Sequence, residues 1–319
     1  MTANLTGSLW VRGLLTLAVL VILAIKIDMR ATAEALLRLA PGAVVAVLAL
    51  LAVDRGVMVW RWIILLRARG ADVTTKSAAW IYLVSSFVGG FLPAGVGADV
   101  ARAFTLSQRT ARGSEAVASV AVDRLFGLLS IVVMGVFGAV VAGRQIDGTP
   151  RLLLPAIALI VMSGSVAMLW ADRLMVTMLP GGVQASGPGR RLMRLADAIS
   201  QYRGHRGALA AVALLSIAVQ VLRIVQAYLL GRGIGIDVPF SYYLLFMPIG
   251  LIALLLPISI SGIGAPQGII VWLLAPAGVP QPQALALSTL IVVSGIVANL
   301  PGAWLYLRAA RSATAEGPK

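Results

Sequence analysis

The chain has 319 residues, of which 60% are hydrophobic and 12% are charged, and it carries a formal net charge of +14. A soluble domain cannot bury so much apolar surface, so this composition predicts an all-α polytopic membrane protein. The absence of cysteine excludes disulfides, thiol catalysis and cysteine-based metal sites, and the single histidine, His205, argues against a histidine metal centre or a catalytic triad. The positive charges lie between apolar runs, as topology signals and lipid contacts do, so we expect no nucleic-acid partner.

The first half of the chain, residues 9–142, contains three apolar runs that can span a bilayer and one that is too short. The predicted spans cover residues 9–25, 41–66 and 116–142. The second span carries Asp54 about 18 Å into the helix at ~1.5 Å per residue, which is near mid-bilayer. A charge at that depth is expensive and normally faces a cavity or a partner. The alternative is a pair with Arg55 or Arg61 that serves only helix packing.

Two interrupted stretches, residues 92–99 (LPAGVGAD) and 256–266 (LPISISGIGAP), follow apolar runs that are too short to cross a bilayer. Each starts with Leu-Pro and continues into Gly-X-Gly-Ala, so proline blocks the helix and glycine permits a turn. Non-helical backbone inside a membrane protein is tolerated only where protein or a water-filled cavity satisfies it. Broken segments at corresponding places in two halves indicate a transporter binding site. Two ordinary kinked spans are the simpler alternative.

The second half, residues 152–308, repeats the order of two spans, an interrupted segment and a final span. Its spans are predicted at residues 152–170, 208–230 and 284–307. The basic link at 171–207 contains an amphipathic stretch, 190–202, which we expect to lie on the membrane surface. The span at 208–230 carries a polar stripe that should face the protein interior. The members of this stripe are Ser216, Gln220, Arg223 and Gln226.

The distribution of Lys and Arg predicts the topology. With a cytoplasmic N-terminus and two re-entrant helical hairpins, most loop Lys and Arg fall in the cytoplasm, whereas plain spans would place the basic 171–207 link outside. The cytoplasmic links are then residues 67–76, 102–112 and 171–207. We therefore expect one transmembrane domain, 1–319, in the cytoplasmic (inner) membrane, with six full spans plus two re-entrant hairpins and both termini inside. The halves 9–142 and 152–308 would form an inverted-topology repeat.

The two hairpin tips are predicted to approach each other near the midplane, where helix termini carry a partial positive charge and attract an anionic group. Full positive charges would come from Arg61, Arg102, Arg124 and Arg223. Arginine suits phosphate because its guanidinium fork can bind two oxygens at once. Alternatively, the Asp99–Arg102 pair binds the Asp123–Arg124 pair and only locks the hairpin to its neighbour.

Four stretches carry a family resemblance: residues 61–70 (RWIILLRARG), 91–102 (FLPAGVGADVAR), 122–128 (VDRLFGL) and 256–268 (LPISISGIGAPQG). In this order, and over nearly the whole chain, the protein resembles the flippase-like membrane region of lysylphosphatidylglycerol synthases and their stand-alone relatives. The resemblance implies an integral membrane protein that moves, or helps to move, a lipid or lipid-linked headgroup between leaflets. The positions that match the family's motifs are Pro93, Gly97, Asp99, Arg102, Asp123, Arg124, Pro257, Ser259, Gly262 and Gly264.

The chain departs from the family pattern in two places. Ala98 stands where the family often has glycine, which is a mild change. Pro266 and Gln267 stand where the family often has Arg-Glu, so an ion pair at the second hairpin is missing. After Leu307 only a short and mostly polar tail follows, so lysyl transfer is not expected from this chain.

The leading hypothesis is a lipid flippase or transporter that moves an anionic or phosphate-bearing lipid, either a phospholipid or a polyprenyl-linked one, between leaflets. Membrane lipids are the expected partners, a homo-oligomer is left open, and neither a cofactor nor enzymatic activity is expected. The sequence has no nucleotide-binding loop, so direct use of ATP is not expected. The predicted substrate-binding residues are Arg61, Pro93, Gly97, Asp99, Arg102, Asp123, Arg124, Arg223, Pro257, Ser259, Ser261, Gly262, Gly264 and Gln267.

Two other functions remain as alternatives. The first is an integral membrane enzyme that acts on a lipid-linked substrate, with Asp54, Asp99 or Asp123 as a base or metal ligand. The second is a non-transporting scaffold for envelope lipid biosynthesis.

Overall fold

The computed structural model describes residues 27–90, 97–109, 113–142, 159, 162–164, 167–178, 180, 184, 186–255 and 265–315. Within these residues all regular secondary structure is helical. The predicted span at 9–25 and most of the predicted span at 152–170 lie outside the described residues. Most of the two interrupted stretches also lies outside the described residues, which leave out 91–96 and 256–264.

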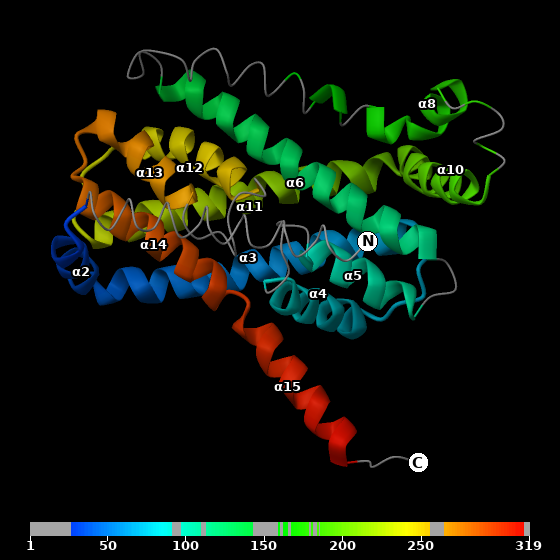
Figure 1. The fold of residues 1–319 in the computed structure, drawn as a ribbon, viewed down its shortest axis with the longest axis horizontal. Coiled ribbons are helices and arrows are strands. Elements are labelled where there is room, and N and C mark those ends of the chain that lie inside the picture. Colours follow the sequence, from blue (N-terminus) through cyan, green and yellow to red (C-terminus); the bar gives the residue numbers. More distant parts are fainter. Residues whose placement is uncertain are drawn as a thin grey trace, which may run out of the picture.

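Long apolar helices dominate the bundle (Figure 1). The longest are α3 (Pro41–Ala68), α6 (Gly113–Ala142) and α11 (Arg206–Gly233). At ~1.5 Å per residue they extend for about 42–45 Å, which exceeds the ~30 Å hydrocarbon core of a bilayer. Together with the C-terminal apolar segment they make four helices long and apolar enough to cross a membrane within the described chain. The protein is therefore a multi-pass membrane protein.

The last span, predicted over 284–307, is confirmed as a candidate membrane span over Gln281–Ala309, and a short turn divides it into two helices. Helix α14 (Gln281–Val297) ends before a turn at Ala298 and Asn299, and α15 (Leu300–Ala315) begins after it. Pro301 causes this break because proline lacks the amide hydrogen that would continue α14, whereas the first turn of a new helix tolerates it. The start of α15 packs on α4, where an added Cβ on Gly302 would lie 2.0 Å from the carbonyl oxygen of Leu83, and its C-terminal end extends beyond the bundle (Figure 1).

Two pairs of shorter helices flank the interrupted stretches. Helices α4 (Thr75–Gly89) and α5 (Gly97–Ser107) border the first stretch, and α12 (Phe240–Leu255) and α13 (Ala265–Leu274) border the second. In each pair the two helices pack against each other.

Helices α4 and α5 run antiparallel. At one end, a Cβ on Gly89 would lie 2.1 Å from the backbone nitrogen of Ala98, so only glycine fits there. At the other end, Nη1 of Arg109 donates to the hydroxyl of Ser77 at 2.8 Å. The two arms of the first interrupted stretch therefore lie side by side along their whole length.

The basic link contains α8 (Ala171–Met178), α10 (Gly187–Ser200) and the 3-10 helix η2 (Gln201–Gly204). The predicted amphipathic helix forms, and part of its apolar face packs on the bundle. Ala198 and Ile199 are buried in a cluster with Leu65, Val122 and Val212. Leu192 and the arginines of α10 are exposed, and the position of this helix on the membrane surface stays a prediction. The described chain also contains α2 (Met29–Leu37), which packs on α14, and η3 (Ala275–Ala277).

Helices α6 and α12 cross in close contact at Gly138, where an added Cβ would lie 2.1 Å from the carbonyl oxygen of Leu244. Backbone cannot move aside as a side chain can, so Gly138→Ala should lower the free energy of unfolding by ~1–3 kcal/mol. Gly56→Ala is the matched control because no atom lies within 4 Å of its added Cβ, and its helix should be as stable or more stable. Thermal unfolding in detergent measures both variants, and equal midpoints would contradict the close crossing.

Candidate functional site

A carboxylate bound by two arginines lies at the centre of the bundle. Oδ1 of Asp123 accepts a hydrogen bond from Nε of Arg61 at 2.7 Å, and Oδ2 lies 3.0 Å from Nη2 of Arg102. All three side chains are at most 5% exposed. They come from α6, α3 and α5, so one carboxylate joins three helices that are separate in sequence.

The ion pairs continue beyond Asp123. Nη2 of Arg102 also donates to Oδ1 of Asp99 at 2.9 Å, and Oδ2 of Asp99 lies 3.5 Å from Nη1 of Arg124. Arg102 thus contacts Asp123 in addition to Asp99, and Arg124 contacts Asp99, so the two pairs bind each other. This is the locking arrangement that the sequence left open. Three arginines surround two aspartates in this network, an excess of one positive charge.

The guanidinium of Arg102 lies against two aromatic rings. Its central carbon is 5.1 Å from the ring centre of Trp62 and 4.7 Å from that of Tyr82. Such contacts stabilise a cation in a desolvated site. Nε and Nη1 of Arg102 are buried and have no hydrogen-bond partner among the described residues. Arg102 thus retains donors that a ligand oxygen can accept from.

The predicted polar stripe of α11 faces the interior, as expected. Nη1 of Arg61 donates to the hydroxyl of Ser216 at 3.1 Å, which connects the network to a fourth helix. Nε2 of Gln220 donates to the hydroxyl of Ser130 on α6 at 3.2 Å. Ser216, Gln220 and Gln226 are all buried.

Asp54 pairs with Arg223 of α11, whose Nε lies 3.3 Å from Oδ1. Arg55 lies 4.0 Å from the other oxygen of Asp54. Of the two pairs that the sequence left open for Asp54, the one with Arg55 is therefore present, whereas Arg61 binds Asp123 instead. Residues seven positions apart share a helix face, but the partner here comes from the helix that packs on that face.

The charged residues line a cavity of about 230 Å³, which we call the charged cavity. Among the described residues its charged lining consists of Arg61, Arg102, Arg124, Arg223, Asp99 and Asp123. Arg223 has its counter-charge, Asp54, in the wall of the neighbouring cavity, so the other three arginines against two aspartates leave an excess of one positive charge. A neighbouring cavity of about 210 Å³ shares Arg223 and contains Asp54, Arg55 and Gln226 in its wall.

The structure brings together six of the predicted site residues in the charged cavity. Gly97 is buried at the start of α5, two residues before Asp99. Gln267 is buried on α13 but does not line the charged cavity. The remaining predicted residues lie outside the described part of the chain: Pro93, Pro257, Ser259, Ser261, Gly262 and Gly264.

Sequence reasoning missed two aromatic residues of the site, Trp62 and Tyr82. Tyr82 has no distinguishing signal, because it lies in an apolar run where any large side chain would be read as core. Trp62 directly follows Arg61 in a stretch that carries the family resemblance, and this adjacency was the available signal.

The family comparison agrees with this architecture. Residues 9–302 match the family described as the lysylphosphatidylglycerol synthase TM region. The chain belongs to this family. The matched range contains the three helices of the charged network and the whole of the charged cavity. Family membership assigns the protein to membrane domains that act in lipid metabolism or transport. A comparison with curated proteins gave no match.

Asp123→Asn should be among the most destabilising single changes in this protein. It leaves Arg61 and Arg102 buried without their shared counter-charge, and breaking a buried pair from one side costs ~3–5 kcal/mol. Asp237→Asn is the control, because the side chain of Asp237 is 92% exposed beside Arg232 and its loss should leave the unfolding midpoint nearly unchanged.

A double variant, Arg61→Gln with Asp123→Asn, separates charge imbalance from lost packing. It should recover part of the stability lost in Asp123→Asn, as a double-mutant cycle measures. Strictly additive losses would show that the two side chains are not energetically coupled.

Proposed function

We propose that this protein is a transporter that moves an anionic, phosphate-bearing lipid between leaflets without covalent chemistry. The headgroup binds in the charged cavity while the acyl or isoprenoid tail stays in the bilayer. One observation carries the proposal: the cavity wall holds four arginines against two aspartates in the interior of a membrane domain.

The chemistry of the cavity favours a phosphate group. Buried cations inside a membrane are expensive and mark substrate pathways or partners. A buried donor without a partner costs ~1–3 kcal/mol, and Arg102 has two such nitrogens. A phosphate offers acceptor oxygens and negative charge together, so it satisfies these donors and the excess of positive charge in one step.

The carboxylates of the cavity are poor candidates for catalysis. Both oxygens of Asp123 face arginine donors at 3.0 Å or less, and Asp99 lies between Arg102 and Arg124. A general base needs a free oxygen within reach of the proton that it removes. These aspartates act instead as counter-charges that hold the arginines in place.

Re-entrant hairpins are part of the same proposal. Helices α4 and α5, of 15 and 11 residues, are too short to cross a bilayer and pack antiparallel, which supports a hairpin whose tip lies inside the membrane. Helices α12 and α13 are a second such pair. In this arrangement six full spans and the two hairpins form an inverted repeat in the inner membrane. The basic links and both termini then face the cytoplasm.

Purified protein in proteoliposomes tests the proposal with a panel of labelled phospholipids and polyprenyl phosphates. We expect one lipid class to move, and Arg124→Gln to slow that movement by about tenfold or more, because a charge-assisted hydrogen bond to phosphate is lost. Arg124 is suitable because its side chain is 34% exposed, so the fold should tolerate the change. Arg102→Ala should abolish movement.

Arg30→Gln is the matched control, because the side chain of Arg30 is 91% exposed and lies on α2, remote from the charged cavity. It should transport at the rate of the unmodified protein. Movement that persists in both Arg124→Gln and Arg102→Ala would overturn the site. Absence of movement for every lipid, with folded protein and an imposed proton gradient, would overturn transport and favour the enzyme or scaffold function.

A further inference from the structure

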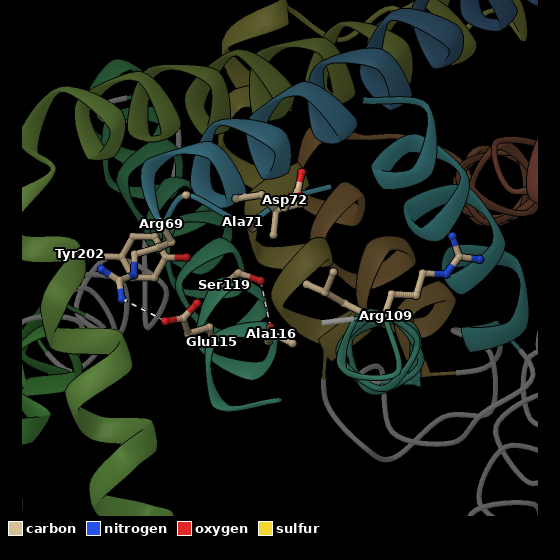
Figure 2. A pocket seen from close by; sticks show the side chains of 11 residues that line it. Arg69, Ala71, Asp72, Arg109, Glu115, Ala116, Ser119 and Tyr202 are labelled. Carbon is tan, nitrogen blue, oxygen red and sulfur yellow. Dashed lines mark hydrogen bonds and ion pairs between the residues drawn. The ribbon is translucent and has the colours of Figure 1, made fainter. Parts of the chain in front are cut away.

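A separate cavity of about 330 Å³ lies where α3 ends and α6 begins, and we call it the vestibule (Figure 2). Its principal lining residues are Leu66, Arg69, Leu106, Glu115, Ser119 and Tyr202. The mouth is formed by the exposed loop residues Gly70 and Asp72 and by Arg109 at the end of α5. The vestibule therefore opens at the end of the bundle that carries the basic links 67–76 and 102–112.

One wall of the vestibule is polar. Nη2 of Arg69 lies 3.4 Å from Oε1 of Glu115 and also donates to the side chain of Gln201. The same guanidinium lies 5.9 Å from the ring centre of Tyr202. Its Nε is buried and has no hydrogen-bond partner among the described residues. Figure 2 shows Arg69, Glu115 and Tyr202 grouped at one end of the vestibule, with Arg109 at the other.

The vestibule and the charged cavity are lined by the same three helices. On α6, Ser119 of the vestibule lies one turn before Asp123 of the charged cavity. On α5, Leu106 lies one turn after Arg102. On α3, Leu66 follows Arg61 by five residues, which is about 7.5 Å along the helix. The two cavities are thus stacked along the helices.

The indole of Trp62 lies between residues that line the two cavities. It is fully buried, and its Nε1 donates to the hydroxyl of Ser119 in the vestibule wall at 3.3 Å. The face of the same indole contacts Arg102 in the wall of the charged cavity. Tyr82 packs beside it with ring centres 6.1 Å apart. Trp62 thus contacts one lining residue of each cavity, Ser119 of the vestibule and Arg102 of the charged cavity.

We propose that the vestibule is the site that receives the phosphate-bearing headgroup at the basic end of the bundle, and that Trp62 is the barrier between this site and Arg102. The proposal rests on the proposed transport function. Arg69 supplies the first cationic contact. The headgroup reaches the charged cavity when the indole leaves Ser119 and Arg102, and a phosphate oxygen then replaces the ring as the partner of Arg102.

The cysteine-free chain permits single-cysteine reporters on each side of the barrier. Ala71→Cys reports from the vestibule, and Leu128→Cys reports from the charged cavity. A membrane-impermeant anionic thiol reagent is added to vesicles at the basic end only. With Trp62 present, Ala71→Cys should react fast and Leu128→Cys slowly. Trp62→Ala should speed Leu128→Cys by about tenfold or more, because a hydrogen bond and a cation–ring contact are lost, and should leave Ala71→Cys unchanged.

Two milder variants keep the test decisive if Trp62→Ala does not fold. Ser119→Ala removes the hydrogen bond and keeps the indole, and Trp62→Phe keeps a ring without the N–H donor. Both should give intermediate reaction rates at Leu128→Cys. The barrier is overturned if the reaction rate of Leu128→Cys is unchanged in every folded variant. It is also overturned if this rate already equals that of Ala71→Cys with Trp62 present.

The ligand of the vestibule is tested by protection of Ala71→Cys. Anionic phosphatidylglycerol in a zwitterionic vesicle should slow the reaction, and Arg69→Gln should remove this protection. Protection by inorganic phosphate without anionic lipid would instead assign the vestibule to a free phosphate, and no protection by either would overturn the receiving site. Because these readouts need no transport, loss of lipid movement with intact protection and barrier would contradict the proposed function alone.

Discussion

The main constraint on this fold is that several charged side chains are buried inside a membrane domain, away from water. An unpaired charge in this environment is costly, and Asp123 removes part of that cost by binding Arg61 and Arg102 through separate oxygens. Because the partners belong to different helices, these buried charges are paired only when α3, α5 and α6 pack against one another. The hydrogen bond from Arg61 to Ser216 extends this requirement to α11. The ion pairs therefore set the relative positions of these helices.

Locking and binding are compatible roles for these residues. The network joins α5 to α6 through Arg102 and Arg124, yet it still carries more positive than negative charge. In the proposed transport, an anionic headgroup in the charged cavity would compete with the aspartates for the same guanidinium groups. Binding would then weaken the contacts that hold α5 against α6, and this would couple ligand occupancy to helix movement through the same hydrogen bonds.

Charged residues of α3 and of its C-terminal end line three of the cavities in the described part of the chain. Arg69, Arg61 and Asp54 follow one another at intervals of eight and seven residues, about 12 and 10.5 Å along the helix axis. They line the vestibule, the charged cavity and the neighbouring cavity in turn. A polar group that moved along this helix would meet one of these charged side chains in each of the three cavities. Trp62 lies between the first two of them, Arg69 and Arg61.

The sequence by itself determined the class of protein, the family and the polar face of α11, because hydropathy, motif order and helical periodicity are local properties of the chain. It also selected the charged residues that meet in the cavity. Only the tertiary structure decided their partners: Asp54 pairs with Arg223, 169 positions away, and not with Arg61 on its own helix. It also decided that α10 packs on α6 and that the last span contains a turn before Pro301. These outcomes depend on which helices lie side by side, and periodicity within one helix carries no information about its neighbour.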